Sequence, residues 1–175
     1  MRFWWLSLFL LLVGCGREPL VQSQSYVFGT LVDISIYGES EAHAHKVSNI
    51  IFQDFQRLHQ QYHAWQKGSE LYALNEAFSQ GKTIQVSPEL REMLQEASAL
   101  SMQSGGLFNP ALGQLIRAWG FQRDEFTPVD IQPDAIKKMV NAKPSMADVV
   151  MTGEKIHSKN PAVQLDLGGY AKGYA

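Results

Sequence analysis

The alternation of apolar and polar positions predicts where the folded part of the chain begins. Residues 26–37 are rich in β-branched and aromatic side chains, and apolar and polar positions alternate from Val32 to Ile36. A period of two places the apolar side chains on one face of a strand. We therefore expect one strand over residues 26–37, interrupted at Gly29 by a bulge or a closely approaching ligand.

Apolar residues at three- and four-residue steps, which is the spacing of one helix face, predict two of the later helices, and an N-cap predicts a third. The longest covers residues 40–61. A second covers residues 88–103 and begins with Ser87 as N-cap and a proline at the first helical position. Ser69 can cap a short helix over residues 70–75 in the same way.

Shorter elements fill the rest of the chain. We expect a helix from Asn109-Pro110 to Gly120, a loop over residues 121–133 and a small helix over residues 133–141. Short strands are expected at residues 83–86, 147–151, 155–158 and 162–167. Because strands and helices mix without a regular βαβ alternation, the predicted fold class is α+β and not a doubly wound sheet.

The N-terminus has the pattern of a lipoprotein signal. Arg2 precedes an apolar run, which Leu12-Val13-Gly14-Cys15 closes with small residues and the chain's single cysteine. The run is shorter than the roughly 18 to 20 residues of a spanning helix. We predict a signal peptide over residues 1–14, a lipid on Cys15, a tether over residues 15–25 and one folded domain over residues 26–175. An ordinary signal peptide cleaved elsewhere is the alternative.

Charge excludes one class of partner. Fifteen basic and seventeen acidic side chains occur without a run of either sign. A nucleic-acid-binding chain would carry a basic patch, so no nucleic-acid partner is expected. With 45% apolar residues the chain can build a core by burial alone.

Two familiar kinds of catalytic site fit poorly. His59 and His63 lie four apart, as the zinc ligands of His-Glu-x-x-His do, but Gln60 stands where that motif has its glutamate. Surface or structural histidines are the favoured interpretation. No Gly-x-Ser-x-Gly occurs, and Cys15 is assigned to the lipid, so hydrolysis through a serine or thiol nucleophile is not expected.

Two other features suit a nucleotide. Trp65, Phe108 and Trp119 lie near turns, where they fit either core packing or stacking on a flavin or adenine. Gly168-Gly169-Tyr170-Ala171-Lys172-Gly173 is neither a Walker A loop nor Gly-x-Gly-x-x-Gly. Its unhindered amides and the charge of Lys172 suit a phosphate, but a structural turn explains it equally well.

Four segments together resemble one family. They are Phe28-Gly29-Thr30; Trp65-x-x-x-Ser69-Glu70-Leu71 with Leu74-Asn75; Ser104-Gly105-Gly106-Leu107-Phe108-Asn109-Pro110 with Trp119-Gly120-Phe121; and Leu165-Asp166-Leu167-Gly168-Gly169-Tyr170-Ala171-Lys172-Gly173-Tyr174-Ala175. In order and spacing they resemble the ApbE family of FAD:protein FMN transferases, which implies an ApbE-like, T-fold-like domain.

The resemblance implies a magnesium-dependent periplasmic transferase. It would split FAD, attach FMN to a threonine of an acceptor flavoprotein and release AMP. Magnesium would bind the carbonyl of Ala175. By motif position, the residues that would line the FAD site are Phe28, Trp65, Leu107, Phe108, Asn109 and Lys172.

The chain departs from the family pattern at several points. Phe28 replaces a methionine, Trp65 a tyrosine and Asn109 an aspartate, and family members continue beyond Ala175 with further magnesium ligands. We therefore expect a fragment with little or no transferase activity. The alternatives are an FAD pyrophosphatase and a non-catalytic flavin-binding lipoprotein. The expected location is the periplasmic face of the inner membrane, with the outer membrane as the alternative.

Overall fold

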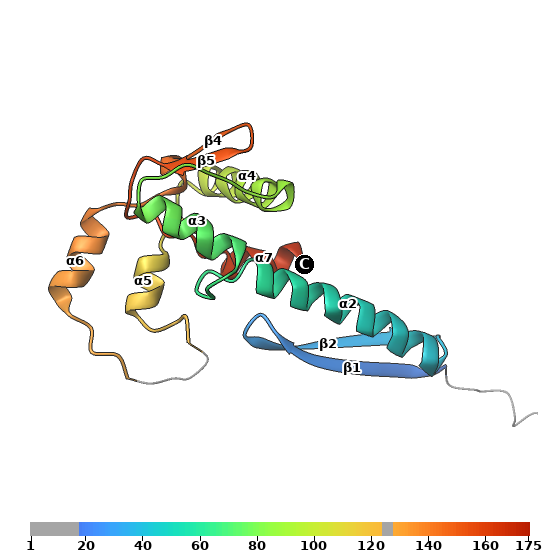
Figure 1. Cartoon of the computed structure of the whole chain (residues 1–175). Helices are drawn as coiled ribbons and strands as arrows, with labels where there is room; N and C mark the ends of the chain where they lie inside the picture. The colour runs from blue at the N-terminus through green and yellow to red at the C-terminus, as the bar shows by residue number, and fades with distance from the viewer. Residues whose placement is uncertain (1–17, 124–127) are drawn as a thin grey trace, which may run out of the picture. The chain divides into compact units, whose positions relative to one another are not determined.

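The structure is a computed structural model, and it describes residues 18–123 and 128–175 (Figure 1). The predicted signal peptide and Cys15 lie outside the described residues. The chain forms two compact units, with the boundary between Asp54 and Phe55. Each unit is described by itself.

The first unit holds a β-hairpin and the start of a long helix. Strand β1 (Leu20–Val27) pairs antiparallel with β2 (Thr30–Tyr37), and helix α2 (Glu41–Gln61) follows. The predicted helix over residues 40–61 is thus confirmed within one residue. The predicted tether is wrong for Leu20–Ser25, because these residues form cross-strand pairs; the amide of Gln24, for example, donates to Asp33 over 2.6 Å.

The single strand predicted over residues 26–37 is also wrong, because the chain reverses at Phe28-Gly29. Both residues have positive φ, 56° and 68°, and Val27 pairs with Thr30 across them. Two central residues with positive φ are the signature of a type I′ hairpin turn. Gly29 therefore serves a chain reversal and not a bulge.

The second unit contains the helices that the apolar spacing predicts. Helix α3 (Glu70–Ser79) begins after Ser69, whose hydroxyl accepts a bond from the Tyr72 amide, and it runs four residues beyond the prediction. Helix α4 (Pro88–Gln103) has the predicted bounds and the predicted N-cap. Helix α5 (Gly113–Ala118) begins later than expected, and α6 (Pro133–Asn141) is as predicted.

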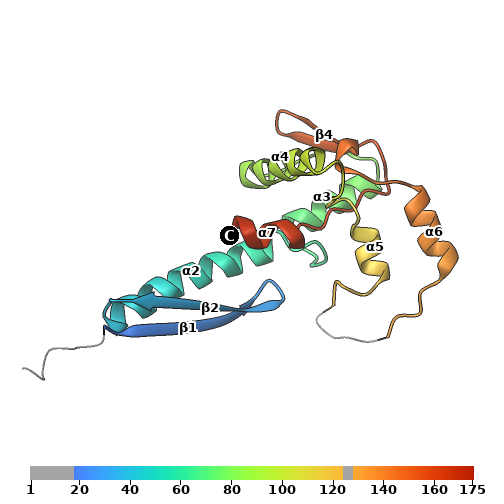
Figure 2. The same ribbon diagram turned by 180° about the vertical axis from the view of Figure 1, so that it is seen from behind.

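Three short antiparallel strands lie in the order β3-β5-β4. They are β3 (Ile84–Gln85), β4 (Val149–Thr152) and β5 (Lys155–Ser158), and the 3-10 helix η2 (Met146–Asp148) precedes β4. The β4–β5 hairpin lies beside α4 in both views (Figure 1, Figure 2). The strands predicted at residues 83–86, 147–151 and 155–158 are thus confirmed, although the first is shorter than predicted and the second begins two residues later.

The strand predicted over residues 162–167 is wrong, because the segment forms only one parallel bridge, from Gln164 to Leu112. Helix α7 (Gly168–Tyr174) follows it. The large, fully buried side chains of this unit come from α3, α4, β5 and this segment: Leu71, Leu74, Phe78, Leu90, Met93, Leu94, Ile156, Val163, Leu165 and Leu167. The mixture of helices and short strands is the predicted α+β class. In the described part of the chain, no helix has the length and apolar character that a membrane span requires.

Candidate functional site

The loop between α2 and α3 places Trp65 at one end of the site. The Trp65 backbone amide donates to His63 Nδ1 over 3.1 Å, and the buried Ser69 hydroxyl donates to the His63 carbonyl. His63 also meets His59 edge to face, with ring centroids 5.1 Å apart. Because His63 fixes this loop from within, its role is structural, in line with the sequence-based interpretation.

Asp166 connects Trp65 to the glycine-rich segment. The Trp65 indole Nε1 donates to Asp166 Oδ2 over 3.1 Å, and the Gly168 amide donates to Asp166 Oδ1 over 2.9 Å. The Asp166 amide in turn donates to the carbonyl of Pro110 over 2.9 Å. One residue therefore joins three segments that are far apart in the sequence.

The loop that carries Leu107, Phe108 and Asn109 is held by its own polar side chains. The Phe108 amide donates to the Ser104 hydroxyl over 3.0 Å. The Asn109 amide nitrogen donates to the Pro144 carbonyl over 2.9 Å, while its oxygen accepts from the Ala111 amide over 3.1 Å. An aspartate could not donate to a carbonyl, so the asparagine at this position has a structural role that the sequence comparison with the family pattern did not reveal.

Leu107 and Phe108 differ in exposure. Leu107 is 92% exposed, whereas Phe108 is half-buried. A large apolar side chain that is almost fully exposed at the tip of a glycine-containing loop is available for a ligand or partner. Phe108 combines a packed position with a partly accessible ring.

The segment that precedes α7 is held by a buried side chain. The Asn75 oxygen accepts from the Leu165 amide over 2.7 Å, and the Asn75 nitrogen donates to the Leu165 carbonyl over 2.9 Å. On the other side, the Gly113 amide donates to the Gln164 carbonyl over 2.8 Å. A side-chain amide thus replaces the strand partner that this segment lacks, which explains why a buried, apolar stretch is not a strand.

Helix α7 presents Lys172 and Ala175, which are both exposed. The Lys172 ammonium makes no hydrogen bond or ion pair to any other described residue. Tyr170 instead faces α4, where its hydroxyl donates to Glu96. Burial and this hydrogen bond raise the pKa of Tyr170 above its ordinary value, so Tyr170 stays protonated and acts as a donor.

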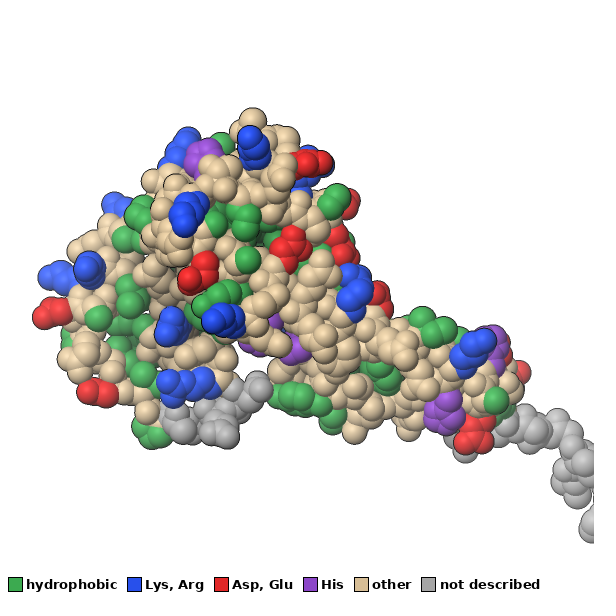
Figure 3. Space-filling view, in the orientation of Figure 1, with side chains coloured by type: hydrophobic (Ala, Val, Ile, Leu, Met, Phe, Trp, Pro, Cys, Tyr) green, Lys and Arg blue, Asp and Glu red, His purple; other side chains and the backbone are tan. Residues whose placement is uncertain are grey.

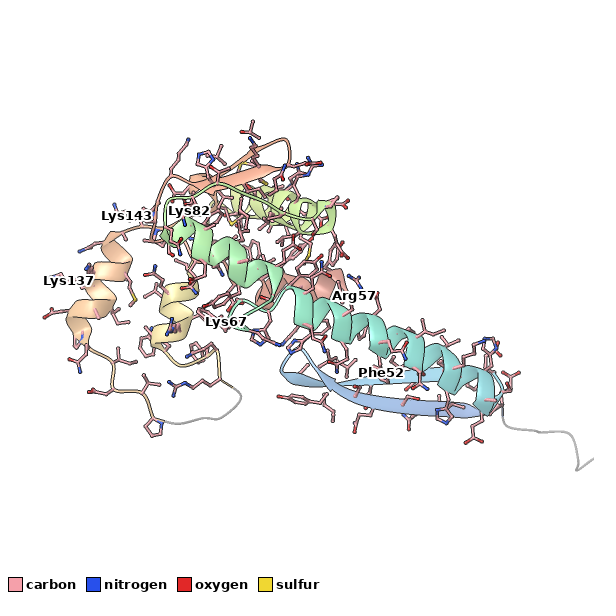
Figure 4. All side chains as sticks on the ribbon, in the orientation of Figure 1. Phe52, Arg57, Lys67, Lys82, Lys137 and Lys143 are labelled. Carbon is pink, nitrogen blue, oxygen red and sulfur yellow. The ribbon has the colours of Figure 1, made fainter. Side chains whose placement is uncertain are left out.

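A second polar contact joins α4 to the end of α2. The Arg57 guanidinium binds both carboxylate oxygens of Glu89, over 3.0 and 3.2 Å, and the Tyr62 hydroxyl donates to Glu89 over 2.6 Å. The hydrogen bonds from Arg57 and Tyr62 lower the pKa of Glu89. Arg57 lies in the C-terminal part of α2, and Lys67 lies in the loop that follows this helix (Figure 4).

The charges of the second unit are unevenly distributed. Lys and Arg side chains outnumber acidic ones around α6, whereas Asp and Glu side chains gather where α4 lies (Figure 3). Glu89, Glu92 and Glu96 share one face of α4. Burial and, to a smaller extent, the negative charges of these three side chains raise the pKa of Tyr174. The α7 tyrosines thus face the acidic helix.

Phe28 belongs to the first unit, where it is half-buried in the hairpin turn. The structure brings Trp65, the Phe108–Asn109 loop and α7 together through residues 164–168 of the second unit.

The described residues do not form a metal site. Among residues 18–123 and 128–175, no three His, Cys, Asp or Glu side chains are placed to hold a metal ion. Both carboxylate oxygens of Asp166 accept bonds from N–H groups. The Ala175 carbonyl alone does not fit the oxygen-rich shell that Mg²⁺ requires, so we derive no step through a metal here.

A pocket of about 190 Å³ lies beside α3 and α5, with Tyr72, Glu76 and Arg117 among its lining residues. None of the six residues expected to contact FAD lines it. It shares Asn75 and Gln164 with the contacts that hold the segment before α7.

Asp166 and Asn75 hold the segments of the candidate site together, but the sequence analysis gave neither residue a role. Both stood in the segments that carry the resemblance, next to buried leucines. A polar residue inside an otherwise buried apolar stretch must find partners, because an unpaired buried polar group is costly. A polar residue between apolar neighbours was therefore the sequence signal that could have identified Asp166 and Asn75 as hydrogen-bonding residues.

The comparisons with known proteins agree on one family. The ApbE family profile matches residues 28–175. The chain is 42% identical over 158 residues to the FAD:protein FMN transferase of Rhodobacter capsulatus, covering 90% of this chain and 30% of that protein. It is 29% identical over 169 residues to the enzyme of the same name from Treponema pallidum, covering 92% and 46%.

Solved structures show the same fold. The ApbE protein of Thermotoga maritima gives a TM-score of 0.76 at 22% identity, covering 89% of this chain and 50% of that chain. The apo flavinyl transferase ApbE of Pseudomonas stutzeri gives 0.73 at 18% identity, covering 93% and 54%. The chain spans about half the length, or less, of these relatives. On the profile match and the 42% identity, this chain belongs to the ApbE family.

Proposed function

We propose that this chain acts in FAD:protein FMN transfer and that its second unit contributes residues that bind FAD. The observation that carries the proposal is the 42% identity, over 90% of this chain, to a protein named for that activity. The contacts of Asp166 support it, because they gather Trp65, the Phe108–Asn109 loop and the glycine-lysine element in one unit.

The side chains suit a flavin nucleotide. Trp65 is half-buried and Leu107 is exposed, so together they offer an aromatic ring and an apolar side chain to planar rings. Lys172 is exposed and makes no ion pair with the described residues, which leaves its charge for a phosphate. Phe28, in the hairpin turn, is proposed as a further flavin contact.

In the proposed reaction, the oxygen of an acceptor threonine bonds to the phosphorus of the FMN half of FAD. The bond from that phosphorus to the bridging oxygen breaks, AMP leaves and the hydroxyl proton is lost. A magnesium requirement, which the family resemblance implies, is part of the proposal, but the described residues do not hold the ion and no step is derived through it. The role proposed for this chain is to bind and orient FAD, with Lys172 stabilising the phosphates.

We further propose that the chain is a lipoprotein on the periplasmic side of a membrane. The support is the N-terminal lipobox pattern that ends at Cys15. Radiolabelled palmitate incorporated into the expressed wild-type chain, but not into Cys15→Ser, is the expected result. Equal labelling of both would refute the anchor.

The transfer itself is tested with the full chain, FAD, magnesium and a threonine-bearing acceptor flavoprotein. Covalent flavin on the acceptor is measured by in-gel fluorescence, and AMP by chromatography. We expect FAD binding with weak labelling, and weaker labelling still with Lys172→Ala. AMP and free FMN without labelling would identify a pyrophosphatase instead. FAD binding with neither product would identify a non-catalytic flavin-binding protein.

A further inference from the structure

Asp166 occupies an unusual position between two hydrogen-bond donors. Its Oδ2 accepts from the Trp65 indole over 3.1 Å and its Oδ1 accepts from the Gly168 amide over 2.9 Å. Trp65 lies 101 residues before Asp166 in the sequence, and Gly168 is the first residue of α7. The carboxylate is therefore a bridge between an aromatic ring and the glycine-rich turn.

We infer that Asp166 is a positioning residue for flavin binding, which sets the orientation of the Trp65 ring relative to the α7 segment. The inference rests on the proposed function, since it assumes that Trp65 contacts the flavin nucleotide. It does not require Asp166 to touch the ligand.

The chemistry of the bridge requires a carboxylate. Both partners of Asp166 are N–H groups, and only a side chain with two acceptor oxygens satisfies both. An asparagine would present its NH₂ group to one of the two donors, so one hydrogen bond would be lost and two donors would face each other. Asp166→Asn, although nearly isosteric, is thus a strong probe of the bridge.

The position of Gly168 adds an independent constraint. A Cβ atom at Gly168 would lie 3.0 Å from Asp166 Oδ1, which is closer than most real contacts of a Cβ atom. The missing side chain therefore lets the carboxylate reach the Gly168 amide. Gly169, the next residue, has nothing within 4 Å of such an atom. Only the first glycine of the pair serves the bridge.

The backbone at Asp166 is held by other contacts. The Leu165 amide and the Leu165 carbonyl are both hydrogen-bonded to the Asn75 side chain. Leu165 and Leu167 are 0% and 1% exposed. The Asp166 amide also donates to the Pro110 carbonyl over 2.9 Å. Loss of the carboxylate should consequently release the indole and the turn while the chain around them stays folded.

A double-mutant cycle on the full chain tests the inference. The variants are Trp65→Phe, which keeps an aromatic ring without the N–H donor, Asp166→Asn, and both together. The dissociation constant for FAD is measured by quenching of flavin fluorescence. We expect each single change to weaken binding about tenfold, about 1.4 kcal/mol, and the second change to add less than twofold. Asp134→Asn, an exposed carboxylate in α6, is the matched control and should change binding less than twofold.

A second measurement does not depend on FAD. In the ¹⁵N spectrum of the full chain, Trp65→Phe identifies the Trp65 indole signal, and Asp166→Asn should move that signal upfield and speed its exchange with water. An unmoved signal would refute the contact and with it the inference.

The two readouts separate the possible failures. If wild-type protein binds FAD and the two substitutions act additively, Asp166 does not work through Trp65 and the inference falls alone. If wild-type protein does not bind FAD at all, the proposed function falls, and the positioning role falls with it. If Asp166→Asn lowers the urea midpoint of unfolding enough to account for its loss of FAD binding, the role of Asp166 is structural, and the inference is also overturned.

Discussion

Two glycine-containing turns of this chain are built in opposite ways. The turn at Asp166–Gly168 is held by side chains that come from distant segments, through Trp65 and Asn75. The turn at Phe28-Gly29 is a local chain reversal between paired strands, with both φ values positive. The resemblance to the ApbE family assigns both turns to FAD, yet one is specified by long-range hydrogen bonds and the other by local backbone conformation.

The difference shows which interactions determine the stability of each turn. A turn held by buried hydrogen bonds fails when a remote partner is removed. A turn with a non-glycine residue at φ 56° already stores strain, because left-handed backbone costs an ordinary side chain about 1–2 kcal/mol. Substitutions should therefore harm the first turn and can improve the stability of the second.

The largest expected effect is that of Asn75→Ala. It removes both hydrogen bonds to Leu165 and leaves a buried amide and carbonyl without partners. We expect a loss of about 3 kcal/mol in the free energy of unfolding, since each unpaired group costs roughly 1–3 kcal/mol. Urea denaturation measures it, with the exposed neighbour Glu76→Ala as control. A loss within about 0.5 kcal/mol of the control would contradict the account.

Gly113→Ala tests the other side of the same segment. A Cβ atom there would lie 2.6 Å from the Gln164 carbonyl oxygen, a backbone atom that cannot move freely. The expected cost is about 2 kcal/mol in the free energy of unfolding. Gly169→Ala is the matched control, because the space around it is open and alanine favours a helix; it should stabilise by about 0.5 kcal/mol. Equal effects of the two changes would be evidence against this packing.

Phe28→Asn addresses the strained turn. Asparagine tolerates left-handed backbone and is common in type I′ turns, so we expect a gain of about 1 kcal/mol in the free energy of unfolding. The same change should weaken FAD binding if the ring is a flavin contact. Phe28→Leu keeps the strain without the ring, and it should weaken binding with no gain in stability. Destabilisation by Phe28→Asn would show that the hairpin depends on the ring more than on the turn.

The smallest effect is expected at Glu89, which fixes the end of α2 near the Trp65 loop. Arg57, followed by Tyr62, holds the pKa of Glu89 below its ordinary value in the folded state. A carboxyl group whose pKa is lower in the folded state stabilises that state at pH values above its unfolded-state pKa. This stabilisation is lost as the pH falls through the folded-state pKa. Glu89→Gln should therefore flatten the decline in stability below about pH 5, by less than about 1 kcal/mol because the pair is partly exposed. Unfolding in urea at several pH values measures it. An unchanged pH profile would argue against the pair.

The sequence predicted the elements whose signals are local. The helix of residues 88–103 has both a repeating apolar face and a capped, proline-marked start, and its bounds were correct. The hairpin was missed because Phe28 is not a residue that signals a turn and because Gln22 and Gln24 resemble linker residues. Their role as outward-facing strand positions depends on pairing with a partner that appears later in the chain.

The candidate site was predictable as a set of motifs but not as an arrangement. Trp65 and the glycine-lysine element were identified from motif position, whereas the bridge through Asp166 spans 101 residues and leaves no local pattern. Residues 162–167 were expected to be a strand because apolar residues predominate in this segment. Their partner is the side chain of Asn75, and a side chain that replaces a strand cannot be read from periodicity.

The most direct test of the account is equilibrium dialysis of FAD against the full chain, comparing Trp65→Ala with Trp119→Ala. Trp119 is 51% exposed in the same unit and belongs to no hydrogen bond of the Asp166 bridge. We predict saturable binding by the wild-type chain, at least tenfold weaker binding by Trp65→Ala and less than a twofold change for Trp119→Ala. Equal weakening by the two substitutions, or no saturable binding by the wild-type chain, would contradict the claim that these residues form a flavin site.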